Sequence, residues 1–163
     1  MPHLPRKKDI NVFDTLDEQC AERHFLGKTR EEIHELLLEK YVSLYEDLAY
    51  MGPVAFAYYA PAWEQLFGAF ADIEVTDDVA EWTLSIISIR CISLRNETPE
   101  SIAAMHHLLA CCERYYNSPA RHKYYADEAR SYGYAESLIG TPPGLQKDLD
   151  KCARLHTVLN GEA

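Results

Sequence analysis

Histidine and cysteine occur twice in this chain with the spacing that a helical metal site uses. His107 and Cys111 are four positions apart, and so are Cys152 and His156. Residues four apart share one face of an α-helix, so two such pairs facing each other would form a Cys2His2 zinc site. The short Cys-x-x-Cys knuckle of structural zinc sites is missing. We therefore expect these side chains to pack in a core, and we predict no metal and no other cofactor.

A nucleophilic cysteine is the second chemistry that the residue types permit. Cys111 and Cys112 stand beside His106, His107 and Glu113, a set from which a Cys/His catalyst can be built. Adjacent residues on a helix point about 100° apart, however, which is poor geometry for one shared reaction centre. The chain also has no G-x-S-x-G elbow and no glycine-rich phosphate loop. Buried free thiols are the favoured interpretation of all five cysteines.

The whole chain has a net charge of −10. Its acidic residues are concentrated in the first half. Residues 9–85 hold 17 Asp or Glu against 4 Lys or Arg, whereas residues 86–163 hold 9 of each. A surface of this charge repels nucleic acid and anionic membranes and attracts basic proteins. The alternative interpretation is an ordinary solvated face that only keeps the protein in solution.

Helix start signals recur along the chain and define its elements. Thr15 and Thr29 are each followed by a Glu three residues later, which is the capping-box pattern. After Thr29, apolar residues recur every three or four positions, which predicts an amphipathic helix ending near Met51. Further helices are predicted at residues 79–94, after Thr98-Pro99, after Ser118-Pro119 and at residues 145–159. No segment shows the alternation of a strand.

These signals predict an all-α fold in one domain. We expect a bundle of about six helices over residues 11–163, with neighbours packed antiparallel because the connections are short. Residues 1–10 are expected to form a mobile tail. No apolar run approaches the length of a membrane span, and no apolar segment follows the basic start as in a secretory signal. We therefore expect a cytoplasmic protein.

The segment at residues 54–67 is apolar on all sides, as a central buried helix should be. Pro61 lies inside it, where its ring clashes with the preceding turn, so we expect a kink there. A kink either bends the helix around the core or opens a pocket. A pocket would be lined by Tyr58, Tyr59, Trp63 and a histidine, either His106 or His107. This arrangement would suit an enzyme or a protein that binds a small ligand.

Tyrosine is abundant, with eleven residues, several of them in adjacent pairs such as Tyr58-Tyr59 and Tyr124-Tyr125. Because neighbours on a helix diverge, each pair should place one ring in the core and one near the surface. Tyrosine serves both environments, since its ring is apolar and its hydroxyl is polar. The pairs therefore suggest a partner surface, and they also permit a homodimer.

Three segments carry a resemblance to known proteins. They are Phe25-Leu-Gly-Lys28, Glu46-Asp-Leu-Ala-Tyr-Met51 and Ala55-Phe-Ala-Tyr-Tyr-Ala-Pro-Ala62. Over about the first 45% of the sequence, which contains these segments, the chain resembles small bacterial all-helical proteins. The departure from the pattern is Gly52-Pro53 at the helix junction. Some small acidic proteins of this general kind are immunity proteins that block a toxin, and the resemblance implies no catalytic residue.

Together these observations favour binding over catalysis, with an enzyme or a small-ligand-binding protein as the alternative. We predict an acidic protein that neutralises a basic partner by steric occlusion, most concretely an immunity protein against a bacterial toxin. A DNA mimic that inhibits a DNA-binding protein is a further alternative. The predicted partner is a protein, and neither nucleic acid nor a membrane. The residues predicted to contact it are Glu31, Glu35, Glu39, Glu46, Asp47, Tyr58 and Tyr59.

Overall fold

The computed structural model describes residues 3–135, 139–140, 142 and 144–161. In this part of the chain the regular structure is helical, with eight α-helices, two short 3-10 helices and no strand. The α-helices are α1 (Lys7–Ile10), α2 (Leu16–Phe25), α3 (Arg30–Tyr50), α4 (Pro53–Glu64), α5 (Ile73–Cys91), α6 (Pro99–Tyr116), α7 (Pro119–Ser131) and α8 (Leu145–Leu159). The 3-10 helices are η1 (Gln65–Gly68) and η2 (Leu94–Asn96). None of the helices described here is both long and apolar enough to cross a membrane.

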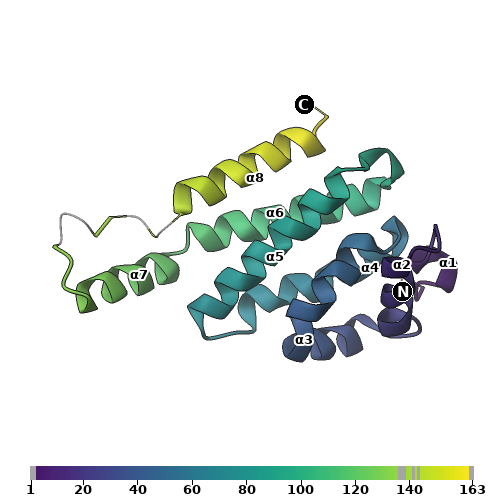
Figure 1. Ribbon diagram of the computed structural model, residues 1–163, viewed down its shortest axis with the longest axis horizontal. Helices are drawn as coiled ribbons and strands as arrows, with labels where there is room; N and C mark the ends of the chain where they lie inside the picture. The colour runs from purple at the N-terminus through teal and green to yellow at the C-terminus, as the bar shows by residue number, and fades with distance from the viewer. Residues whose placement is uncertain (1–2, 136–138, 141, 143, 162–163) are drawn as a thin grey trace.

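The helices form one domain in which α4, α5 and α6 make the centre. Helix α4 packs against α3 and α6, while α5 packs against α3, α6 and α8. Figure 1 shows α8 along one side of this centre and α1 and α2 at the opposite end from α7, which extends beyond the end of α6. The all-α prediction is therefore confirmed.

Capping explains where most of these helices begin. The hydroxyls of Thr15, Thr29 and Thr98 each accept the backbone N–H three residues on, and all three starts form the reciprocal capping box. Pro99 and Pro119 occupy first helical positions, where a missing N–H leaves no hydrogen bond unmade. The predicted starts of α2, α3, α6 and α7 are thus confirmed. Helix α5 begins earlier than predicted, because the Asp72 carboxylate caps it by accepting the N–H of residue 74.

The core is centred on α4, which buries Phe56, Tyr59 and Trp63 completely. The kink expected at Pro61 is not confirmed, since α4 continues as a helix through this residue to Glu64. Pro61 lies in the last turn, where its ring removes a single internal hydrogen bond from the helix. The backbone irregularity lies instead in α3, where Lys40 has non-helical angles of φ −136° and ψ 21°.

The end of the expected N-terminal tail is part of the folded domain. Residues 7–10 form α1, and Ile10 is fully buried. The Ile10 carbonyl accepts the N–H of Gly52, at 2.8 Å between nitrogen and oxygen, at the junction of α3 and α4. A Cβ at position 52 would lie 2.4 Å from the Asp9 carbonyl oxygen, so the approach requires glycine. The apolar side chain of Ile10 explains the docking, and with α1 the described residues hold eight α-helices, more than the six or so that were expected.

Candidate partner-binding surface

Helix α3 carries the predicted acidic residues on its outer face. Ile33 and Leu37 point into the core, which leaves Glu31, Glu35 and Glu39 exposed on the opposite side. Glu46, further along the same helix, is also exposed. Among the described residues, none of these four carboxylates forms an ion pair with a side chain. Their negative charge is therefore available to a partner.

Basic residues are few on α3. Arg30 and Lys40 are the two basic side chains of the helix. Arg30 is held over Tyr58, with its guanidinium 4.5 Å from the ring centroid and its Nε donating to the Tyr58 carbonyl oxygen at 2.6 Å. Tyr58 is consequently only partly exposed, lying beneath Arg30 rather than free at the surface.

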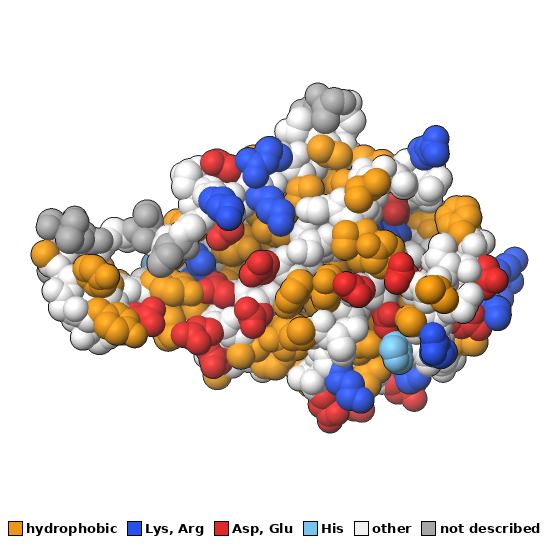
Figure 2. All heavy atoms as spheres, in the orientation of Figure 1, with side chains coloured by type: hydrophobic (Ala, Val, Ile, Leu, Met, Phe, Trp, Pro, Cys, Tyr) orange, Lys and Arg blue, Asp and Glu red, His pale blue; other side chains and the backbone are white. Residues whose placement is uncertain are grey.

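A second group of carboxylates lies on α5, and residue-by-residue prediction missed it. Asp72, Glu74, Asp78 and Glu81 are all exposed. Partial burial and then the negative charges of the neighbouring carboxylates raise the pKa of Asp78. Figure 2 shows acidic side chains interspersed with apolar ones over the face that α5 crosses. The excess of acidic residues over residues 9–85 was the signal that could have identified them.

Asp77, in the same stretch, has a structural role. Its carboxylate accepts the Tyr115 hydroxyl at 2.8 Å, the Arg121 Nε at 2.6 Å and the Tyr125 hydroxyl. The buried Arg121 guanidinium also lies 5.2 Å from the Tyr125 ring centroid. Burial and the Asp77 carboxylate raise the pKa of both tyrosines. This network joins α5, α6 and α7, so these tyrosines fix the position of α7 instead of facing a partner.

Two of the predicted contact residues are wrong, because they are buried. Asp47 is 6% exposed and its Oδ2 lies 2.6 Å from His24 Nδ1, where burial raises the pKa of the carboxyl group. Tyr59 is fully buried, and its hydroxyl donates to the carbonyl oxygens of Phe25 and Lys28, each at 2.9 Å. Both residues face α2 or the turn that follows it, and this packing removes them from the surface.

A hollow does exist beside Pro61, with a volume of about 440 Å³. Its lining includes His107 and Glu64, together with small side chains of α4 and α6. Tyr58, Tyr59 and Trp63 do not line it. The Trp63 indole N–H donates instead to the Thr83 hydroxyl at 2.7 Å in the core. The predicted pocket is thus only partly right in its lining.

The residues considered for zinc binding do not come together. His107 lines the hollow against α4, whereas His106 faces α8 and stacks on His156 with ring centroids 5.6 Å apart. Burial and the charge of His156 lower the pKa of His106. His156 Nε2 lies 3.1 Å from a Glu113 carboxylate oxygen. Over the described residues, no group of three or more His, Cys, Asp or Glu side chains could hold a metal ion.

The cysteines on α6 and α8 have the properties of core residues. Cys111, Cys112 and Cys152 are buried. Burial raises the pKa of Cys111 to about 11, helped by the charge of Glu64, and raises the pKa of Cys152 to about 12. The Cys112 thiol donates weakly to the Ala80 carbonyl oxygen at 3.7 Å, facing α5. A thiol is nucleophilic as the thiolate, so these environments disfavour cysteine catalysis.

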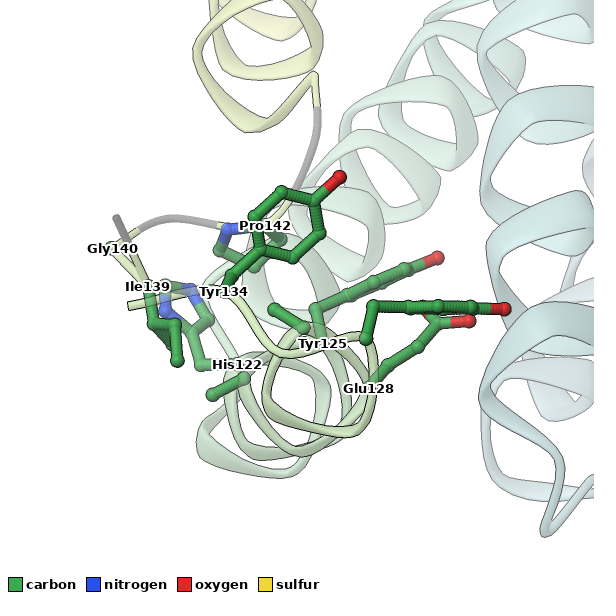
Figure 3. A pocket seen from close by; sticks show the side chains of 10 residues that line it. His122, Tyr125, Glu128, Tyr134, Ile139, Gly140 and Pro142 are labelled. Atoms are coloured by element: carbon green, nitrogen blue, oxygen red, sulfur yellow. The ribbon is translucent and has the colours of Figure 1, made fainter. Parts of the chain in front are cut away.

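An aromatic hollow of about 360 Å³ lies between α7 and the segment that follows it. Figure 3 shows Tyr125 and Glu128 projecting in a similar direction from α7, while Tyr134 and Pro142 come from the later segment. His122 completes one side of the lining. Such a hollow suits an apolar or aromatic group. It is distinct from the hollow beside Pro61.

Comparisons of the chain with protein-family models, with curated proteins and with solved structures found no match.

Proposed function

We propose that this protein binds a basic protein partner through the carboxylates of α3 and α5, without turnover. The observation that carries the proposal is the lack of charge compensation on these two packed helices. Nine exposed carboxylates lie on them or at the cap of α5, whereas Lys40 is their exposed basic side chain. The acidic residues are Glu31, Glu32, Glu35, Glu39, Glu46, Asp72, Glu74, Asp78 and Glu81.

The more specific form of the proposal is a cytoplasmic immunity protein. A toxin with a cationic active cleft would be drawn to this surface by long-range attraction and then blocked by occlusion. The charge distribution and the sequence resemblance support this form. A DNA-binding protein would offer a similar cationic cleft, and the identity of the captured partner separates the two cases.

The alternative function, binding of a small ligand beside Pro61, is supported by the 440 Å³ hollow that Glu64 and His107 line. Convergent polar groups in a hollow are what a ligand site requires. A thermal-shift screen of metabolites would detect such a ligand. A hit whose stabilisation disappears in His107→Ala would favour this alternative over partner binding.

The main test is capture of the partner from a lysate of the host by the tagged protein. The variant Glu35→Gln/Glu39→Gln is compared with Glu100→Gln/Asp150→Asn, which removes the same charge elsewhere on the exposed surface. We expect one stoichiometric basic protein, released by salt. Its association rate should fall several-fold in the α3 variant and little in the control.

Salt provides the second arm of this test. Charges beyond the Debye length are screened, and this length falls from about 10 Å at 0.1 M salt to about 3 Å at 1 M. The association rate should therefore drop steeply over this range. An unchanged rate, or an equal effect of the α3 and control variants, would contradict the electrostatic proposal.

A further inference from the structure

Large apolar side chains stand exposed at the junction of α3 and α4. Phe13, Leu16 and Ile92 are 69%, 77% and 82% exposed. Phe13 and Ile92, with Tyr50, line a groove of about 310 Å³ beside this junction, and Leu16 follows Phe13 closely in the chain. Single exposed apolar residues are common, but a group of them around a groove is typical of an interaction surface.

Phe13 is held outside by a well-defined loop. The buried Glu18 carboxylate accepts the backbone N–H groups of Val12 at 3.1 Å, Phe13 at 3.0 Å and Thr15 at 3.0 Å. Asp14 adopts a left-handed conformation with φ 57°, which is uncommon for a residue other than glycine. The backbone that carries the exposed ring is therefore fixed, which lowers the entropy that a partner must overcome on binding.

The floor of the groove is equally well fixed. Arg90 is buried, and its Nη1 donates to the carbonyl oxygens of Leu48, Ala49 and Met51 at 3.1, 3.1 and 2.9 Å. Its Nη2 donates to a Glu97 carboxylate oxygen at 2.9 Å. These bonds hold the end of α3, and with it Tyr50, against the end of α5. The groove thus lies between the ends of α3 and α5, which the hydrogen bonds of Arg90 hold together.

The charges near the groove indicate which kind of partner fits. Glu46 lies one helical turn before Tyr50, and Asp17 lies one residue after Leu16. Both are exposed, and their negative charges add to the burial that raises the pKa of Asp47. Arg95 is an exposed basic residue near Ile92. A second copy of the chain would bring two such acidic rims together, whereas a basic segment would be attracted.

We propose that this groove binds a segment of the basic partner that inserts apolar side chains between Phe13, Tyr50 and Ile92. Lysine or arginine side chains of the same segment would face Asp17 and Glu46. The basic character of the partner rests on the proposed function. The groove supplies the apolar anchor that carboxylates alone lack, since binding energy is concentrated in desolvated apolar contacts.

The test is an NMR titration with a short amphipathic peptide of leucine, phenylalanine and lysine. Two matched peptides carry glutamate in place of lysine, or serine in place of the apolar residues. The lysine peptide should bind saturably and shift signals of the groove. Phe13→Ser and Ile92→Ser should each weaken it about fivefold or more, while Leu26→Ser, at an exposed apolar residue outside the groove, should not. Because Phe13 and Ile92 are largely exposed, both variants should fold normally.

Three results would contradict the proposal that this groove binds a segment of the partner. The shifts would lie elsewhere, the glutamate peptide would bind as tightly, or Phe13→Ser and Ile92→Ser would leave binding unchanged. A concentration-dependent dimer in sedimentation, dissolved by Phe13→Ser, would assign the surface to a second copy instead. If salt-sensitive capture from lysate persists in Phe13→Ser, only the proposed binding at the groove is contradicted. If capture does not change with salt or with the Glu35→Gln/Glu39→Gln substitutions, while the peptide still binds at the groove, the proposed function is contradicted.

Discussion

Replacement of Arg90 by methionine should destabilise the protein strongly, because this side chain connects three segments. The substitution removes the three hydrogen bonds to carbonyls at and just after the end of α3, the one to Glu97, and the stacking of the guanidinium 4.0 Å above the Phe56 ring. The Glu97 side chain is nearly buried and would be left without its counter-charge. Breaking a buried ion pair from one side costs about 3–5 kcal/mol. A typical domain has a free energy of unfolding of only about 5–15 kcal/mol.

The assay is urea and thermal unfolding of the wild type and the variant. For a chain of this size each kcal/mol corresponds to about 2–4 °C, so the midpoint should fall by roughly 6–20 °C. Adding Glu97→Gln to Arg90→Met should recover part of the loss, because a neutral amide then replaces the unpaired carboxylate. Arg95→Met, at an exposed position nearby, serves as the control and should cost less than about 0.5 kcal/mol. A loss below about 1 kcal/mol in Arg90→Met, or an equal loss in the control, would refute this reasoning.

Three further outcomes are expected. Thr83→Val should cost about 1–3 kcal/mol in urea unfolding, since the buried Trp63 indole N–H loses its acceptor, and a loss near zero would show that another acceptor replaces it. Gly52→Ala should cost about 1–3 kcal/mol and speed amide exchange at position 52, because the new Cβ would meet the Asp9 carbonyl oxygen. Asp78→Asn should stabilise the protein by about 0.5 kcal/mol at pH 7, because it removes like-charge repulsion on α5. The pKa of Asp78 is raised on folding, so the wild type gains stability relative to this variant as pH falls, and the difference should vanish near pH 3.

Much of the local structure of this protein is predictable from its sequence alone. Capping boxes at Thr15 and Thr29 place the starts of α2 and α3 correctly, because capping depends only on side chains and amides a few residues apart. The helical period likewise predicts that Glu31, Glu35 and Glu39 share the wet face of α3. In each case the deciding interactions lie within one or two turns of the chain.

Neighbouring residues show where the sequence stops being sufficient. Glu46 is exposed and Asp47 is buried, and the difference is that Asp47 meets His24 on α2. In the same way His106, rather than His107, meets α8. Adjacent helical positions differ by about 100°, so the angle at which two helices dock decides which of the pair is covered. That angle depends on packing between distant segments, which local patterns do not encode.

Apolar residues show most clearly what the sequence predicts and what only the tertiary structure decides. From composition, Phe13 and Ile92 would be assigned to the core, just as Phe25 and Ile33 are. Phe25 and Ile33 are fully buried, but Phe13 and Ile92 stand on the surface at the groove. The sequence by itself determined most of the helix starts and the acidic face of α3, because these follow from short-range hydrogen bonding and periodicity. Only the tertiary structure decided which apolar and acidic groups remain free for a partner, because solvent exposure depends on which helix faces pack together.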